Sequence, residues 1–315
     1  MTLSSFLELV EIKTKIASLF PFLVALAYCA YYYQSFNWIN TGLFFVAMLS
    51  FDMATTVMNN TMDYIKAKNL TYKKEENVLG RDGISVRLAF SILIGMVTLS
   101  ALIGLVLVYR TNLLLLLVGL ACFFIGLFYT FGPIPISRMP LGEILSGFTM
   151  GLGIFGIMVY INVPIETTAA IFYHNGILTG AVDLVFLAKV FLQALPLVCT
   201  IANIMLSNNI CDLETDISNH RYTLVYYITK ERALLLYQWL YYTAFLAITL
   251  AVLLRISPWL MLATWLLFPM IQKNIKTFQA KQEKSTTFVL AIKNLVLLHS
   301  LQIILLLVAT VIGKG

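Results

Sequence analysis

Long apolar runs alternate with short polar loops along the whole chain. An α-helix needs about 20 residues to cross the hydrocarbon core of a bilayer, and nine of these runs are close to that length. The eighth run is short for a full crossing. The pattern predicts an all-α integral membrane protein, a nine-transmembrane-helix bundle that forms one domain over residues 1–315. The expected spans are Ile16–Gln34, Ile39–Met58, Arg87–Tyr109, Leu113–Phe131, Leu141–Val163, Leu184–Leu206, Ala233–Leu254, Pro258–Gln272 and Thr287–Ile312.

Composition excludes an ordinary soluble domain. The 315 residues are 60% hydrophobic and only 11% charged, and the mean hydropathy is +0.88. Glu8 and Glu11 precede the first apolar run, and no small-residue cleavage site follows it, so we expect no cleavable signal peptide. The four cysteines lack metal-ligand spacing and are expected to be small buried hydrophobes.

The basic residues predict the orientation in the membrane. All but four of the 21 Lys and Arg residues fall on one side when the loops are assigned to alternate faces. The positive-inside rule then predicts a multi-pass cell-membrane protein with a cytoplasmic N-terminus and a C-terminus outside. This topology explains the net charge of +6, and we expect the lipid bilayer as a partner and no nucleic acid.

Two polar segments repeat one motif, at the ends of the second and sixth predicted spans. Asn59-Asn60-Thr61-Met62-Asp63 and Asn208-Asn209-Ile210-Cys211-Asp212 both read NNxxD. Polar clusters at matching membrane depths are costly unless they hold something, and paired acidic clusters suit a polyanion carried by divalent metal ions. The repeat therefore predicts chemistry on a diphosphate, at the cytoplasmic face, in two pseudo-repeated halves with motifs at 59–69 and 208–223.

The second motif is the richer in charge. Asp212 and Asp216 lie one helical turn apart, so the two carboxylates can share a magnesium ion that keeps positions for phosphate oxygens and water. Arginine and threonine in the following loop are suited to hydrogen-bonding phosphate. A solvated loop that merely ends the helix is the simpler alternative. The expected substrate-binding residues around this pair are Asn208, Asn209, Arg221 and Thr223.

The first motif has one certain carboxylate, Asp63. Asn59 lies one turn before it and Asn60 beside Asn59, while Ala67 occupies the position that corresponds to Asp216. A metal ion here would need help from phosphate, water or the Asn side chains. Asn59 and Asn60 are accordingly expected to bind substrate.

Basic residues crowd the loop that follows the first motif. Most should be cytoplasmic anchors, and Lys66 and Arg81 are our choices for contact with the diphosphate. Asp52 shares the helical face of Asp63 and must point into the bundle, because a lone carboxylate in a membrane span is costly. It could assist the site, or it could only position the helix through an interior hydrogen bond.

With these motifs in view, the chain resembles the UbiA superfamily of intramembrane prenyltransferases over essentially its whole length. The run from Asn208 to Asp216, followed by Arg221, Thr223 and Leu224, is similar to the signature of the 1,4-dihydroxy-2-naphthoate prenyltransferases of menaquinone synthesis. Tyr129-Thr130-Phe131-Gly132-Pro133-Ile134-Pro135 and Leu141-Gly142-Glu143 also resemble that branch. The sequence departs from the family pattern at Asn60, Ala67, Asn69, Cys211 and Arg221.

The resemblance implies a nine-helix fold and a Mg²⁺-dependent reaction. A polyprenyl group would pass from polyprenyl diphosphate to the aromatic acceptor 1,4-dihydroxy-2-naphthoate, with loss of carbon dioxide, giving demethylmenaquinone. Asp63, Asp212 and Asp216 would hold the metal. Tyr129 would stabilise the allylic cation or stack on the acceptor, unless it is an interfacial belt residue. Glu143 would orient or deprotonate a hydroxyl, unless it is only a charge at the start of a helix.

Other functions stay open at this stage. A related enzyme could use another acceptor, such as 4-hydroxybenzoate, haem or a glycerol-based lipid. Asn60 and Ala67 leave room for an inactive relative. A secondary transporter also has repeated motifs in two halves, but here both motifs leave the membrane on the same side, which disfavours a midplane alternating-access site.

Overall fold

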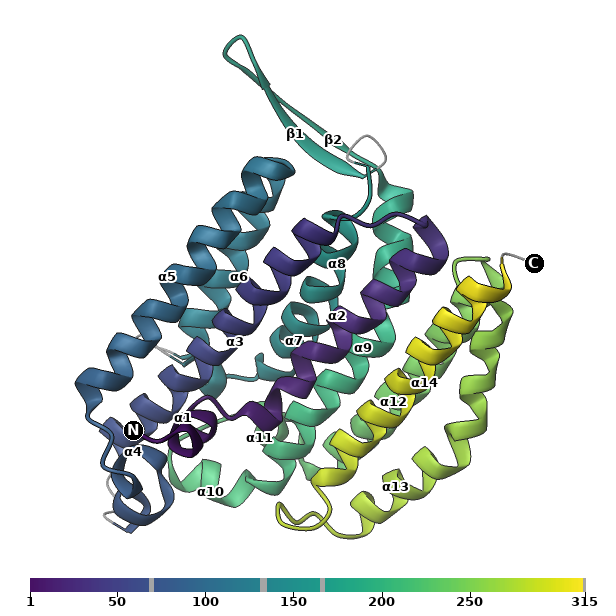
Figure 1. The fold of residues 1–315 in the computed structure, drawn as a ribbon. Helices are drawn as coiled ribbons and strands as arrows, with labels where there is room; N and C mark the ends of the chain where they lie inside the picture. The colour runs from purple at the N-terminus through teal and green to yellow at the C-terminus, as the bar shows by residue number, and fades with distance from the viewer. Residues whose placement is uncertain (68–70, 131–134, 165–167, 314–315) are drawn as a thin grey trace. The chain divides into compact units, whose positions relative to one another are not determined.

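The computed structural model describes residues 1–67, 71–130, 135–164 and 168–313 (Figure 1). The chain divides into two compact units. Unit 1 contains Met1–Leu19 and Trp38–Pro135, and unit 2 contains Phe20–Asn37 and Ile136–Gly315. Each unit holds one of the two NNxxD motifs.

Unit 1 is built around the long helix α3 and its neighbour α5, which pack against each other along their length. Its core gathers Leu9, Ala54, Val57, Leu79 and Ala89, all buried. Gly126 lets α6 approach α3, since a Cβ there would lie 2.6 Å from the ring of Phe51. The helices are α1 (Leu3–Leu9), the first turn of α2 (Ile16–Tyr28), α3 (Trp38–Lys66), α4 (Val78–Arg81), α5 (Val86–Arg110) and α6 (Leu114–Thr130), with a 3₁₀ turn at Ile12–Lys15 and a π turn at Tyr72–Glu76.

Unit 2 is built around α9, which packs against α12 and against the π-helical segment Gly147–Gly153. The close approach of that segment depends on Gly151, where a Cβ would lie 2.7 Å from the backbone nitrogen of Val198. The helices are the rest of α2, α7 (Gly142–Ser146), α8 (Ile154–Tyr160), α9 (Leu184–Cys211), α10 (Leu213–Ser218), α11 (Leu224–Ile228), α12 (Lys230–Leu253), α13 (Phe268–Ala280) and α14 (Val289–Ile312).

The structure confirms the predicted all-helical membrane fold but not the count of nine crossings. Within the described ranges, seven helical stretches are long and apolar enough to span a membrane. The fourth predicted span corresponds to the shorter α6. The eighth, Pro258–Gln272, is a 3₁₀ segment at Trp259–Leu267 followed by α13. Pro269, at the start of α13, lacks the N–H needed to continue a preceding helix.

A β-hairpin between α8 and α9 is an addition that we did not predict. Strands β1 (Ala169–His174) and β2 (Ile177–Val182) pair antiparallel, with His174 opposite Ile177. The connecting Asn175 and Gly176 have φ of 48° and 81°, as a two-residue type I′ turn requires. Asp183 closes the base, because its N–H donates to the Thr168 carbonyl at 2.7 Å.

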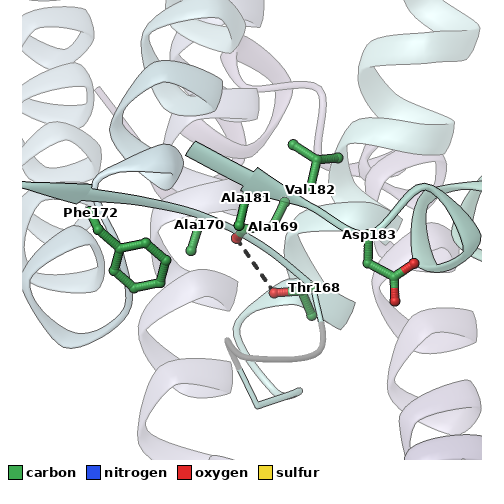
Figure 2. Close-up of a pocket in the computed structure, with 7 residues that line it drawn as sticks. All are labelled: Thr168, Ala169, Ala170, Phe172, Ala181, Val182 and Asp183. Atoms are coloured by element: carbon green, nitrogen blue, oxygen red, sulfur yellow. Dashed lines mark hydrogen bonds between the residues drawn. The ribbon is translucent and has the colours of Figure 1, made fainter. Parts of the chain in front are cut away.

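Small residues line a hollow at the base of the hairpin. Figure 2 shows Ala169, Ala170, Ala181 and Val182 around it, with Phe172 at one end and Asp183 at the other. Its walls are mainly apolar, and the Asp183 carboxylate already caps α9 by accepting from the N–H groups of two residues in its first turn. The hollow therefore offers little chemistry, and the candidate site lies elsewhere.

Candidate functional site

The second motif lies at the junction of α9 and α10. Asn208 and Asn209 belong to the last turn of α9, Asp212 ends that helix, and Asp216 lies in α10. The Asp216 N–H donates to the Asp212 carbonyl at 2.8 Å, so the chain between them forms a helical turn. The structure therefore confirms that the two carboxylates are one turn apart.

Asp212 is held by a lysine from far along the chain. Its Oδ2 accepts from Lys284 Nζ, in the loop between α13 and α14. Sequence reasoning counted Lys284 only among the cytoplasmic basic residues. The ion pair is partly exposed, and such pairs contribute little to stability. Lys284 can therefore be displaced from Asp212 at small cost.

Asp216 is buried beside Arg221. Its side chain is 5% exposed, and its Oδ1 lies 3.4 Å from Arg221 Nε. His220, at a positive φ of 55°, turns the chain so that the Arg221 N–H donates to the Asp216 carbonyl at 2.8 Å. Burial raises the pKa of Asp216 above its usual range, and the Arg221 guanidinium opposes that shift. A buried carboxylate with one long ion pair is under-coordinated and suited to binding a cation.

Glu143 contacts the second motif directly. It lies in the first turn of α7 and is 3% exposed. Its Oε1 accepts from Asn209 Nδ2 at 2.9 Å. The structure thus brings together two predicted site residues that are 66 positions apart, and the contact fixes the orientation of both side chains. Glu143 does lie at a helix start, as one of the two interpretations expected, but it is buried there, and its role toward the acceptor stays a prediction.

Several buried polar atoms around this motif lack a hydrogen-bond partner within the described part of the chain. Proteins leave few such atoms, so a cluster of them indicates a bound ligand or water. All four belong to residues that the sequence singled out. They are Glu143 Oε2, Asp216 Oδ2, Arg221 Nε and Thr223 Oγ1.

The oxygen ligands of the second motif fit a magnesium ion that is shared with a phosphate. Among the described residues, no three His, Cys, Asp or Glu side chains gather as a ready metal site. Mg²⁺ is commonly bound through one or two carboxylates and completes its octahedron with waters and substrate phosphates. Asp212 and Asp216, with the unpaired Oδ2 of Asp216, meet that requirement.

The first motif lies in the last turns of α3, which continues to Lys66. The side chains of Asp63 and Lys66 are exposed. Asn60 is held by the N-terminal segment, since its Nδ2 donates to the Leu9 carbonyl at 3.0 Å and to Glu11 Oε1 at 3.2 Å. Asn60 would have to release these acceptors to bind a diphosphate. Its role in substrate binding, like that of Asn59, stays a prediction.

Arg81 is also engaged by the N-terminal segment. Its two terminal nitrogens donate to Glu8 at 2.8 and 2.6 Å, and its Nε donates to Asp82 at 2.9 Å. This fork lowers the pKa of Glu8 below its ordinary value. A phosphate could replace the Glu8 carboxylate on the same fork, so the predicted contact of Arg81 with diphosphate requires an exchange of partners.

Asp52 positions α3. Its Oδ1 accepts from Lys15 Nζ at 2.8 Å and its Oδ2 from Ser18 Oγ at 2.6 Å. Lys15 is 5% exposed and also donates to Thr56 Oγ1 at 2.6 Å. Both carboxylate oxygens of Asp52 therefore have partners. Of the two roles we considered, assistance to the site and positioning of the helix, the structure favours positioning: Asp52 links the start of the first span to the helix that carries Asp63.

Part of the Tyr129–Glu143 region falls outside the described residues. Tyr129 lies at the end of α6 and is partly buried, whereas residues 131–134 and Asn69 are not described. Tyr129 and Glu143 belong to different units. The role of Tyr129 therefore stays a prediction.

Comparison with known proteins places the chain in a family. The sequence profile of the UbiA prenyltransferase family matches residues 18–312. The 1,4-dihydroxy-2-naphthoate octaprenyltransferase of Bacillus subtilis (strain 168) is 26% identical over 260 residues, which cover 80% of this chain and 76% of that protein.

Solved structures share the fold. A UbiA homolog from Archaeoglobus fulgidus bound to DMAPP and Mg²⁺ has a TM-score of 0.66 and 14% identity, over 98% of this chain and 100% of that one. The apo structure of a UbiA homolog from Aeropyrum pernix K1 has a TM-score of 0.68 and 18% identity, over 93% and 98% of the two chains. The profile match extends over nearly the whole sequence, and the chain therefore belongs to the UbiA prenyltransferase family.

Proposed function

We propose that this protein transfers a polyprenyl group from polyprenyl diphosphate to 1,4-dihydroxy-2-naphthoate, with loss of carbon dioxide, and produces demethylmenaquinol, the reduced form of demethylmenaquinone. The observation that carries the proposal is the buried Asp216, whose Oδ2 lacks a hydrogen-bond partner in the described chain, one turn from Asp212. The relative from Bacillus subtilis supports the choice of acceptor.

The second motif would bind the diphosphate end of the donor. Asp212 and Asp216 would hold Mg²⁺, with Asp63 of the first motif as a further ligand. When bound, the ion neutralises charge that develops on the leaving diphosphate. Arg221 Nε and Thr223 Oγ1 each lack a hydrogen-bond partner in the described chain, although Nε lies 3.4 Å from Asp216 Oδ1. These donors would hold phosphate oxygens as the carbon–oxygen bond breaks.

Lys284 would change partners during binding. In this structure its ammonium lies on Asp212. If Asp212 holds Mg²⁺, Lys284 would leave this carboxylate and its ammonium would become available to a phosphate oxygen. Lys66 and Arg81 are proposed to assist the leaving group in the same way. Through these exchanges, binding of the polyprenyl diphosphate would change the ion pairs of the cytoplasmic loops.

The acceptor would be oriented by Glu143. Its Oε1 is fixed by Asn209 at 2.9 Å, while Oε2 has no described partner. Oε2 would accept the proton of a ring hydroxyl, which raises electron density on the naphthalene ring. The ring then attacks the allylic cation, and the new carbon–carbon bond replaces the bond to the carboxylate. A water-poor helix bundle protects the cation from hydrolysis, and Tyr129 is proposed to stabilise it.

We also propose that the N-terminus and both motifs face the cytoplasm. The distribution of Lys and Arg supports this orientation. Modification of a cysteine introduced at exposed Lys281 by an impermeant reagent, in intact and in opened cells, tests it. Labelling only in opened cells is expected, and labelling in intact cells would reverse the topology.

The experiment that tests the function is acceptor choice by the purified full-length chain in lipid. Initial rates with 1,4-dihydroxy-2-naphthoate, 4-hydroxybenzoate, haem b and a glycerol-based lipid acceptor are compared at matched polyprenyl diphosphate and Mg²⁺. We expect the naphthoate to be preferred, with prenylated naphthoquinol identified by mass. A clear preference for another acceptor would move the protein to another branch of the family.

A further inference from the structure

The hairpin β1–β2 exposes apolar side chains on both faces. Beyond its base, Tyr173 is 71% exposed and its cross-strand partner Leu178 is 63% exposed. On the opposite face Phe172 and Ile177 are also exposed. Figure 1 shows the hairpin projecting from the end of unit 2 at which α9 begins. A two-stranded hairpin with no covered face is marginally stable in water, so this one needs a surface to cover it.

The composition of the hairpin identifies the kind of surface. No Asp, Glu, Lys or Arg occurs from Thr168 to Val182. An uncharged segment with aromatic and branched apolar side chains and a small polar turn is typical of the interface between lipid headgroups and hydrocarbon. Electrostatic docking to a charged protein surface is disfavoured by the same composition.

The hairpin continues the lipid-facing surface of a membrane-spanning helix. It leads through Asp183 into α9, whose first residues Leu184, Val185 and Leu187 are exposed. α12 packs on α9 after the short connection through α10 and α11, so it runs back toward the end of unit 2 at which α9 begins. Trp259 follows α12 at that end and is exposed. Tryptophan is enriched at membrane interfaces.

The backbone of the hairpin sets its depth. Each strand has one outer edge whose N–H and C=O groups are not paired by the other strand, and the hydrocarbon core cannot satisfy such groups. Water and lipid headgroups can. The hairpin is therefore suited to the headgroup region and not to the membrane interior.

We propose that the β1–β2 hairpin is a lipid anchor that lies in the interface of the bilayer leaflet opposite to the second motif. The 28 residues of α9 separate the two, which corresponds to about 42 Å at 1.5 Å per residue. The hairpin thereby fixes the depth of α9, and with it the level at which Asn208 and Asp212 leave the membrane.

Spin labels measure that depth in the full-length chain. Labels are attached to cysteines introduced by Tyr173→Cys or Leu178→Cys in a background that lacks the four native cysteines and retains prenyl transfer. Lys281→Cys, in the exposed loop before α14, is the aqueous control. Leu246→Cys, on the exposed surface of α12 two turns before the helix ends at Leu253, is the hydrocarbon control. The chain is reconstituted in phosphatidylcholine nanodiscs, and collisions with oxygen and with a water-soluble nickel chelate are compared.

Interfacial lipid contact predicts that both hairpin labels lie between the two controls. They should collide less with nickel than Lys281→Cys and less with oxygen than Leu246→Cys. Nickel accessibility equal to that of Lys281→Cys would overturn the proposal, as would oxygen accessibility equal to that of Leu246→Cys. Spin–spin broadening that disappears on dilution with unlabelled chain would show that a second copy covers the hairpin, and would also overturn it.

A second measurement avoids the cysteine background. Tyr173→Trp in otherwise native protein should gain fluorescence that lipids brominated near the headgroup quench more strongly than lipids brominated near the chain end. The four native tryptophans are subtracted with the unsubstituted chain. Added fluorescence that neither brominated lipid quenches would contradict the anchor, as would equal quenching by the two lipids.

Discussion

Asp216→Asn separates a chemical role of the second motif from a structural one. The substitution keeps the size of the side chain and removes the charge. The ion pair with Arg221 is long, at 3.4 Å, and the arginine side chain is 36% exposed, so its loss costs about 0–1 kcal/mol of stability. Removing a buried carboxylate whose pKa is already raised by burial offsets part of that cost. We therefore expect the folded protein to keep its stability within about 1 kcal/mol.

Activity should respond far more strongly. If Asp216 holds the ion that stabilises the leaving diphosphate, its loss resembles the removal of one preorganised electrostatic group, which costs about 100- to 1,000-fold in rate. A 100-fold loss corresponds to about 2.7 kcal/mol of transition-state stabilisation. The expected effect on rate is thus larger than the effect on folding, and the two can be distinguished.

The assay combines turnover with binding. Prenyl transfer is measured over a range of Mg²⁺ concentrations, and calorimetry follows Mg²⁺-dependent binding of a non-hydrolysable polyprenyl diphosphate analogue. Glu214→Gln is the matched control, since it removes an exposed carboxylate from the same short helix. We expect Asp216→Asn to lose both signals and Glu214→Gln to keep them. Undiminished transfer and binding by well-folded Asp216→Asn would refute the reasoning.

Three further predictions concern the ties of the N-terminal segment in unit 1. Lys15→Met should destabilise the protein by up to about 3 kcal/mol, because it leaves the partly buried Asp52 carboxylate, whose side chain is 17% exposed, without its cation; thermal unfolding in detergent measures this, and an unchanged midpoint would contradict the role of the ion pair. Asn60→Asp should cost about 1–3 kcal/mol, because it replaces an amide donor with an acceptor facing a carbonyl and a carboxylate; equal or greater stability would contradict it. Arg81→Gln should return the lowered pKa of Glu8 to its ordinary value. The Glu8 contribution to folding stability, which is present at neutral pH and is lost as the pH falls through the lowered pKa, should then disappear. NMR titration of the labelled carboxyl measures the pKa, and a Glu8 pKa that stays lowered would contradict the prediction.

The sequence predicted the positions of the membrane helices well where apolar runs were continuous. Arg87–Tyr109 was expected and α5 spans Val86–Arg110. The prediction of a single span at Pro258–Gln272 was wrong, because the apolar run does not reveal that the backbone forms a 3₁₀ segment before α13. Hydropathy measures composition and length, and backbone winding depends on local packing and prolines.

Local spacing predicted the core of the candidate site. The DxxxD spacing implied that Asp212 and Asp216 lie one turn apart, and the α9–α10 junction shows this. It could not predict that Lys284 reaches Asp212 or that Asn209 holds Glu143. These contacts join residues far apart in the chain, and periodicity carries no information about which loops meet.

The missed hairpin had a signal in the sequence. Asn175-Gly176 between two apolar stretches is a strong short-range indication of a type I′ hairpin. The polar ties of the N-terminal segment had a weaker one. Glu8, Glu11 and Lys15 occur at spacings of three and four residues, but only the fold shows that they meet Arg81, Asn60 and Asp52.

The fate of the naphthoate carboxylate tests the central claim most directly. Purified protein is supplied with polyprenyl diphosphate, Mg²⁺ and carboxyl-labelled 1,4-dihydroxy-2-naphthoate, and labelled carbon dioxide is counted beside prenylated product. The account predicts that carbon dioxide and product appear in equal amounts, and that both are lost in Asp216→Asn. Prenylated product that retains the label, or release of carbon dioxide that survives the loss of the Asp216 carboxylate, would contradict it.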